Sequence, residues 1–167
     1  MRRKSFQTSE SMIEITADAE AIIKGAILSF VATVNEDGTP NLSPKASLTV
    51  RNGKLYFADI ASPGTLRNLN ANAAVEINVV DVFLRRGYRF RGKAFILPPD
   101  GDEYSTIADW VRISNGPEYP VEHVVRIDVT SMSSLLSPAH IFAEPPRSQD
   151  EIQSTYRRKY GMRLTGE

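Results

Sequence analysis

Apolar side chains recur at every second position in three stretches in the first part of this chain. Positions 28–34, 46–50 and 75–79 alternate Leu, Phe, Ala, Val or Ile with mostly polar residues. Because a β-strand points successive side chains to opposite faces, this pattern predicts three strands. After the second of them, Asn52-Gly53 suits the positive φ angles of a type I′ turn, so residues 46–60 are predicted to form a hairpin.

Weaker patterns predict the other elements. Strands are expected over 39–45, 87–97 and 124–130, with Pro40 and Pro44 keeping the first of these short or at a sheet edge. Residues 131–147 carry three of the ten prolines and are expected to be irregular. Capping residues and helical spacing of apolar residues predict four helices, over 16–24, 62–72, 104–115 and 148–160.

Six or seven short strands with helices at the periphery predict an α+β fold, mainly β. The helices do not alternate with the strands, so an antiparallel barrel is favoured over a doubly wound sheet. Closing the barrel also removes the exposed edges that many short strands would leave. The 167 residues suit one domain, divided into an N-terminal arm (1–15), a barrel domain (16–147) and a C-terminal helix packed on it (148–167).

Composition narrows the classes of function. Lys plus Arg and Asp plus Glu each total 20, so no overall charge would attract nucleic acid or an anionic membrane. Without cysteine there is no disulfide, thiolate metal site or thiol nucleophile, which fits a reducing compartment. No apolar run approaches the ~20 residues that span a bilayer. His123 and His140 lack matching carboxylates, so no metal site is expected. From the lack of cysteine and of a spanning segment, the chain is predicted to be cytoplasmic.

Three segments are candidates for ligand binding. The start of the 62–72 helix, Ser62-Pro63-Gly64-Thr65, offers free N–H groups and hydroxyls to a phosphate. Taken alone, a capped helix without a ligand is the favoured explanation, because such caps are common. Residues 85–93 hold five cations. These could bind a phosphate, contact a second subunit or bind nucleic acid, or they could form a solvated sheet face paired with Glu76 or Asp81. Ser43-Pro44-Lys45 could lie against a flat heterocycle or be a plain strand crossover.

Several segments together resemble the pyridoxamine 5′-phosphate oxidase-like family, the FMN-binding split barrels. The resemblance covers residues 20–97 in order and, more loosely, 124–130. It lies in Ala32-Thr33-Val34, Gly38-Thr39-Pro40-Asn41-Leu42-Ser43-Pro44-Lys45, Leu55-Tyr56-Phe57-Ala58-Asp59, Leu66-Arg67-Asn68-Leu69-Asn70-Ala71-Asn72, Val75-Glu76-Ile77-Asn78 and Gly87-Tyr88-Arg89-Phe90-Arg91-Gly92-Lys93-Ala94.

This resemblance implies a six-stranded split barrel that dimerises and holds two FMN molecules at the subunit interface. It places the flavin ring along Ser43, Pro44, Lys45, Ala46 and Ser47. It places the flavin phosphate on the segment that contains Ser62, Gly64, Thr65, Arg67 and Asn68. It assigns the partner subunit's contribution to the strand with Arg86, Tyr88, Arg89 and Arg91.

The chain departs from the family pattern at three places. Gly64-Thr65 stands where the true oxidases carry an Arg-Lys pair, and Gly87 stands where they carry a glutamine of the partner strand. Their C-terminal substrate signature has no counterpart at 157–163.

The resemblance implies an FMN-dependent oxidoreductase that acts on an unidentified small molecule. The alternatives are a non-catalytic flavin- or haem-binding module, a reductase that uses the deazaflavin F420 and, last, a nucleic-acid-binding barrel. No residue is identified as an acid–base catalyst.

Overall fold

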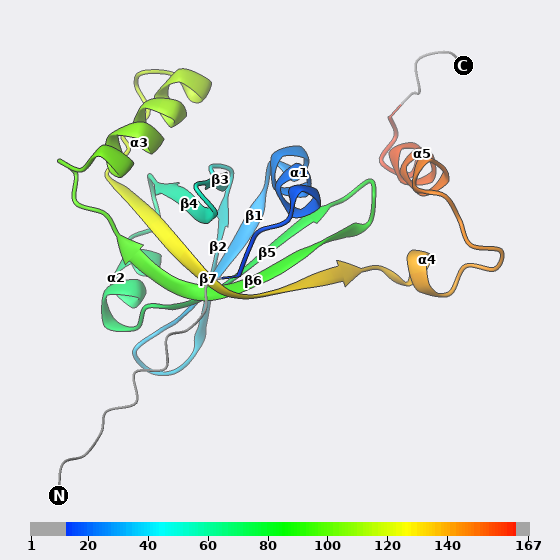
Figure 1. Cartoon of the computed structure of the whole chain (residues 1–167), viewed down its shortest axis with the longest axis horizontal. Helices are drawn as coiled ribbons and strands as arrows, with labels where there is room; N and C mark the ends of the chain where they lie inside the picture. Colours follow the sequence, from blue (N-terminus) through cyan, green and yellow to red (C-terminus); the bar gives the residue numbers. More distant parts are fainter. Residues whose placement is uncertain (1–12, 163–167) are drawn as a thin grey trace, which may run out of the picture.

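The computed structural model describes residues 13–162 and contains one antiparallel sheet of seven strands (Figure 1). Their order across the sheet is β2-β1-β5-β6-β7-β4-β3. The strands are β1 (Ser29–Val34), β2 (Pro40–Lys45), β3 (Thr49–Arg51), β4 (Lys54–Asp59), β5 (Ala74–Asp81), β6 (Arg86–Ile96) and β7 (His123–Leu136). The predicted mainly β, antiparallel fold is confirmed, with seven strands in place of six.

Chain connectivity brings the two edges of this sheet together. β2 and β3 lie at opposite edges, yet only residues 46–48 connect them. So short a connection spans at most about 15 Å, and the sheet must therefore curl until its edges approach each other. The two edges do not pair with each other. The result is a split barrel whose opening lies between β2 and β3.

Within residues 13–162, five helices accompany the sheet: α1 (Ala17–Ala26), α2 (Pro63–Ala71), α3 (Asp102–Asn115), α4 (Pro138–Ile141) and α5 (Gln149–Lys159). The predicted caps form at two of them. The Thr16 hydroxyl accepts a hydrogen bond from the backbone N–H of Ala19 at the start of α1. Ser148 and Glu151 form a complete capping box at the start of α5. None of the helices within residues 13–162 is long and apolar enough to cross a membrane.

The strand β4 divides the hydrophobic core into two parts. Leu55 and Phe57 point into the barrel, where they join inward residues of the other strands and the buried face of α1. Tyr56 and Ala58 point outward and are covered by α3 through Ile107, Ala108 and Val111. Each fully buried apolar side chain contributes about 1.5–3 kcal/mol, so both faces of β4 stabilise the site that it borders.

One prediction of irregular structure is wrong. The strand expected to end near residue 130 continues in β7 to Leu136, because β6 is long enough to pair with it throughout. A register shift at Arg91/Gly92 realigns the ladder, and the outer part of β7 is exposed enough that its residues need no apolar alternation. In the predicted arm, Ile15 is buried, and the Ile13 N–H donates to the Val129 carbonyl. Residues 1–12 of that arm lie outside the described residues.

The predicted C-terminal helix exists as α5 and contacts the turn between β5 and β6. The rings of Phe83 and Tyr160 meet edge to face at 5.7 Å, and the Arg85 guanidinium lies 4.7 Å from the centre of the Tyr156 ring. Figure 1 shows α5 near the tip of the β5–β6 hairpin, at a distance from α3. These contacts join the helix to the far end of the hairpin, away from the opening of the barrel.

Candidate functional site

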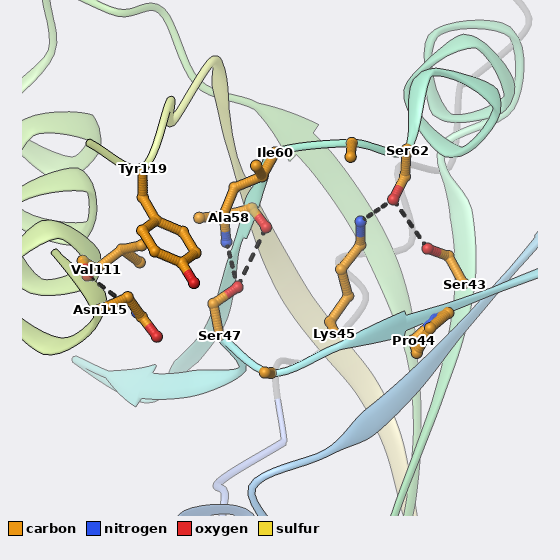
Figure 2. A pocket seen from close by; sticks show the side chains of 12 residues that line it. Ser43, Pro44, Lys45, Ser47, Ala58, Ile60, Ser62, Val111, Asn115 and Tyr119 are labelled. Carbon is orange, nitrogen blue, oxygen red and sulfur yellow. Dashed lines mark hydrogen bonds between the residues drawn. The ribbon is translucent and has the colours of Figure 1, made fainter. Parts of the chain in front are cut away.

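A cavity of about 350 Å³ lies at the split of the barrel, where β2 passes into the 46–48 connection. Figure 2 shows its walls, which come from β2, β4 and the segment that contains α3. The lining residues are Ser43, Pro44, Lys45, Ala46, Ser47, Ala58, Ile60, Ala61, Ser62, Val111, Asn115 and Tyr119. The structure thus brings together the whole 43–47 segment and Ser62, which the sequence placed in two separate candidate sites.

Lys45, on the wall of this cavity, belongs to a buried ion pair. The Lys45 ammonium contacts the Asp59 carboxylate, and their side chains are 5% and 4% exposed. Lys45 also donates to the Ser62 hydroxyl, which lies 3.0 Å from the Ser43 hydroxyl. Burying either charge alone would be costly, so each requires the other. The arrangement holds the Lys45 charge at the cavity wall, next to two hydroxyls.

Asp59 also fixes the start of α2. Its second carboxylate oxygen accepts a hydrogen bond of 3.3 Å from the Ser62 N–H. Ser62 is the N-cap residue, as predicted, but its side chain makes no capping bond because it is engaged with Lys45 and Ser43. Its carbonyl accepts from the N–H of Thr65. One aspartate therefore connects the ion pair of the cavity to the first turn of the helix.

The predicted phosphate segment divides into an open part and a buried part. A Cβ placed on Gly64 would lie 3.8 Å from a guanidinium nitrogen of Arg67. The exposed Arg67 side chain therefore extends back to the first turn of α2. Thr65 and Asn68 are buried instead. Among the described residues, Gly64 and Arg67 are thus the members of this segment that can meet a phosphate at the helix start, where the dipole favours an anion.

Thr65 and Asn68 belong to an inner polar network that ties α2 to β1 and β2. The Asn41 amide donates to Thr65 and to Thr33, at 3.3 and 3.0 Å. The Asn68 amide donates to Thr33 and to Asn35, at 3.1 and 2.8 Å. These bonds satisfy the buried side chains, as burial requires, and account for both residues without a ligand.

The last residue of the 43–47 segment also has a structural role. The Ser47 hydroxyl donates to the Ala58 carbonyl and accepts from the Ala58 N–H, at 3.1 and 3.0 Å. It thereby fastens the connection between β2 and β3 to β4, next to the split. With its hydroxyl engaged in this way, Ser47 presents mainly backbone to the cavity.

A second cavity, of about 470 Å³, lies on the other side of the Ile60–Ser62 loop. Both cavities are lined by Ile60, Ala61 and Ser62, so this loop forms the wall between them. Arg67 and His123 line the second cavity, and the Nδ1 atom of His123 is buried without a hydrogen-bond partner in the described part of the chain. Within residues 13–162, no three His, Asp or Glu side chains are grouped so as to hold a metal ion.

The basic strand does not line the first cavity within one chain. In β6, Arg89 and Arg91 both pair with Glu76 on β5, at 3.0 and 2.6 Å. This is one of the alternatives predicted for the strand, a solvated face with a carboxylate opposite. Arg91 also borders a groove of about 500 Å³ beside Val34 and Thr130.

Arg86 and Tyr88 face the first turn of α1. Both donate hydrogen bonds to Asp18, with the Arg86–Asp18 ion pair at 2.7 Å. The Arg86 guanidinium, with the Tyr88 hydroxyl, lowers the pKa of the Asp18 carboxyl from 3.8 to about 2. The same carboxylate raises the pKa of Tyr88. Arg86, Arg89 and Arg91 of the basic strand are thus paired with carboxylates of α1 and β5 in a single chain.

Gly87 explains one departure from the family pattern. A Cβ at this position would lie 1.9 Å from the Val79 carbonyl oxygen and 2.8 Å from the Val80 Cα. No side chain fits there unless the β5 backbone moves. A glutamine like that of the true oxidases is therefore incompatible with this pairing of β5 and β6.

Seven residues at the site were missed in the sequence analysis: Ala58, Asp59, Ile60, Ala61, Val111, Asn115 and Tyr119. Asp59 carried a usable signal, because it is a carboxylate that ends an apolar strand three residues before the phosphate segment. Val111 belonged to the apolar stripe of a predicted helix, whose packing position could not be known. Asn115 and Tyr119 flank a Gly-Pro turn, and their residue types gave no signal.

The chain matches a family model of known proteins. The model described as pyridoxamine 5′-phosphate oxidase matches residues 15–135. Among solved structures, HupZ from Group A Streptococcus is 30% identical with a TM-score of 0.65, and the match covers 74% of this chain and 95% of HupZ. A search of curated proteins finds no match.

Two more distant structures share the fold. An FMN-binding protein from Syntrophomonas wolfei is 15% identical with a TM-score of 0.62, over 70% of this chain and 82% of that protein. The haem storage protein HutZ from Vibrio cholerae is 14% identical with a TM-score of 0.59, over 74% of this chain and 95% of HutZ. At such identities the likeness concerns the fold alone. The family model, which spans most of the barrel, shows that the chain belongs to the pyridoxamine 5′-phosphate oxidase-like family of split barrels.

Proposed function

We propose that this chain is a homodimeric FMN-binding flavoprotein and an oxidoreductase that acts on a small molecule. The observation that carries the proposal is the cavity at the split, in which the 43–47 segment and the buried Lys45 lie directly beside the start of α2. Its volume of about 350 Å³ falls within the range of small-molecule sites. Family membership supports the flavin as its ligand.

The residues present fit FMN. A flat ring can lie along the backbone of residues 43–47, beside the Lys45 ammonium and the Ser43 and Ser62 hydroxyls. The phosphate can meet the first turn of α2 and the Arg67 guanidinium, which together replace the missing Arg-Lys pair. When bound, FMN supplies hydride or electron transfer, while the protein supplies orientation and electrostatics. Lys45 would orient the ring edge and favour negative charge there.

The proposed dimer completes the site from β6. In it, Arg86, Tyr88, Arg89 and Arg91 of one subunit reach the cavity of the other. Exposed apolar side chains on β1 and β2 support such an interface, because Phe30, Val34 and Leu42 stand uncovered on neighbouring strands in one chain. Clustered apolar residues of this kind commonly mark contact surfaces between proteins. A cytoplasmic location belongs to the same proposal.

The first test is a visible absorption spectrum of the purified protein, before and after incubation with excess FMN and desalting. We expect a retained flavin spectrum whose bands are shifted from those of free FMN. A protein that stays colourless after this treatment contradicts the proposal. Parallel incubation with the deazaflavin F420 and with haem then identifies which alternative cofactor is retained. If FMN is retained but is reduced and reoxidised no faster than free flavin, the chain is a binding module.

The second test concerns the phosphate contact. Arg67→Ala is expected to weaken FMN binding by about 1–3 kcal/mol, because a charge-assisted hydrogen bond is lost. Arg112→Ala removes the same group from the exposed side of α3, where it pairs with Asp109, and is the matched control. Isothermal titration of FMN into both variants measures the difference. Equal affinities would remove the start of α2 from the site.

A further inference from the structure

The two ends of the first cavity differ in charge. One end carries Lys45, whose charge is compensated by Asp59. At the other end, the lining comes from α3 and the loop that follows it, through Val111, Asn115 and Tyr119. Figure 2 shows these three side chains facing Lys45 and Ser62 across the cavity. None of the three carries a charge, so a ligand at the α3 end meets no cation.

The charged side chains of α3 are engaged elsewhere. Glu103 accepts hydrogen bonds from Tyr56 and Arg126, at 2.8 and 3.0 Å. Asp109 and Arg112 pair with each other on an exposed side of the helix. Lys45 is therefore the one charged residue among those that line the cavity in the described part of the chain. A phosphate or carboxylate at the α3 end would gain no countercharge there for the water that it gives up, which favours an uncharged ligand.

Tyr119 and Asn115 present specific groups to this end. The Asn115 amide N–H donates to the Val111 carbonyl at 2.9 Å, which turns its amide oxygen outward as a free acceptor. Figure 2 shows the Tyr119 ring beside the cavity. A half-exposed ring of this kind is suited to stacking against another flat ring. The hydroxyl and the amide oxygen add one donor and two acceptors.

We propose that the α3 end of the cavity binds an uncharged flat ring, of the class of neutral quinones and heteroaromatics, stacked on Tyr119. The inference rests on the proposed function, because it assigns the 43–47 end to the flavin ring and leaves the α3 end for the substrate. Val111 forms an apolar floor, and the Tyr119 hydroxyl can donate a hydrogen bond to a carbonyl oxygen or ring nitrogen of the ligand. The substrate class is thereby a neutral ring rather than a phosphorylated or carboxylated molecule.

The test begins with FMN-loaded, desalted protein, so that retention of flavin is established first. Naphthoquinone and naphthoquinone sulfonate, a neutral and an anionic form of one ring, are titrated separately while the flavin bands are followed. We expect the neutral ring to bind at least about tenfold more tightly than the sulfonate, since burying an uncompensated charge costs more than 1.4 kcal/mol. Equal or tighter binding of the sulfonate would overturn the inference.

Variants on α3 and on the loop that follows it test the charge preference and the stacking contact separately. Tyr119→Ala is expected to weaken the neutral ring by about tenfold, because an aromatic pair and its buried area are lost. Asn115→Arg places a cation at the cavity and should tighten the sulfonate. Ser114→Arg adds the same charge at a neighbouring position that does not line the cavity, and should leave both affinities unchanged. If Tyr119→Ala has no effect, the stacking assignment is wrong.

A failure of FMN binding can be distinguished from a failure of the proposed ring binding at the α3 end. Loss of FMN on desalting counts against the proposed function alone. The same two titrations are then run on flavin-free protein, with the fluorescence of Trp110 on α3 as the signal. A preference for the sulfonate there overturns the charge assignment of the α3 end, and a preference for the neutral ring supports it.

Discussion

Two regions of this protein pair cations with carboxylates, and they do so in opposite surroundings. At the cavity, Lys45 and Asp59 are almost completely buried and share their contacts with Ser62. On the outer face of β6, Arg91 is 62% exposed and shares the Glu76 carboxylate with Arg89. The buried Lys45–Asp59 pair is held in a single geometry. The second lies in water, where either arginine can exchange its partner.

Burial is what separates the two regions. β2 and β4 are distant in the order of the sheet, and the curling of the barrel brings Lys45 and Asp59 together inside it. β5 and β6 are direct neighbours, and their charged residues face outward across one ladder. A charge left alone in the interior is strongly destabilising, whereas exposed ion pairs contribute little. The buried pair therefore stays fixed at the cavity, whereas the exposed arginines remain available for the proposed contact with a second subunit.

The largest expected effect comes from breaking the buried pair. Asp59→Ala should lower the free energy of unfolding by about 3–5 kcal/mol, because it leaves the Lys45 charge buried without a partner. Urea denaturation, followed by far-UV circular dichroism, measures the loss. The double variant Lys45→Met/Asp59→Leu removes both charges and should recover most of it. A loss under 1 kcal/mol for Asp59→Ala would show that the pair behaves as an exposed one.

A smaller effect is expected from the outer pair between Arg86 and Asp18. The pKa of Asp18 is lowered to about 2, so its carboxylate stabilises the folded chain above its ordinary pKa. This contribution should be lost as the pH falls from about 4 towards 2, as the carboxyl becomes protonated in the folded chain as well. The Asp18 side chain is 48% exposed, and solvent screening limits the contribution to about 1 kcal/mol or less.

Acid unfolding of the Asp18→Asn variant tests whether the Asp18 carboxylate causes this pH dependence. The variant should lose stability at neutral pH and converge with the native chain below about pH 2, where the Asp18 carboxyl of the folded native chain is protonated. If the two unfolding free energies keep the same separation over this range, the pH dependence arises from other carboxyl groups.

The smallest effect on stability is expected at Arg89, and it is the most informative about the dimer. Arg89→Ala should change the free energy of unfolding by about 0.2–1 kcal/mol, since its pair with Glu76 is half-exposed. If β6 completes the site of a second subunit, the same variant should weaken both dimerisation and FMN binding. Light scattering and FMN titration measure these. Unchanged mass and affinity would mean that the basic strand is a solvated face.

Local signals in the sequence were sufficient for most of the fold. The alternation over 28–34 and the Asn52-Gly53 turn predict elements that depend on nearby residues only, and both are present. The capping box at Ser148 is equally local and equally present. The outer part of β7 could not be predicted, because its pairing depends on the length of β6 and on a bulge at Arg91/Gly92. Its exposed residues carry no periodic signal.

The candidate site divides in the same way. Residues 43–47 and Ser62 were identified as two separate segments from turn chemistry, helix capping and family resemblance, and the structure brings them into one cavity. Thr65 was assigned to a ligand because of its hydroxyl, and Asn68 because of the family resemblance. In the structure their side chains hydrogen-bond to Thr33, Asn35 and Asn41. A sequence pattern states which groups are available for hydrogen bonding, and only packing decides which partner each one meets.

The sequence by itself determined the antiparallel β architecture, the positions of the turns and caps, and the segments that carry binding chemistry. These depend on backbone preferences and on the period of apolar residues, which act over a few positions. Only the tertiary structure decided that Lys45 pairs with Asp59 and that Tyr119 faces them from beyond α3. Curling of the sheet and the covering of β4 by α3 bring distant residues together, and desolvation then selects which charges can remain.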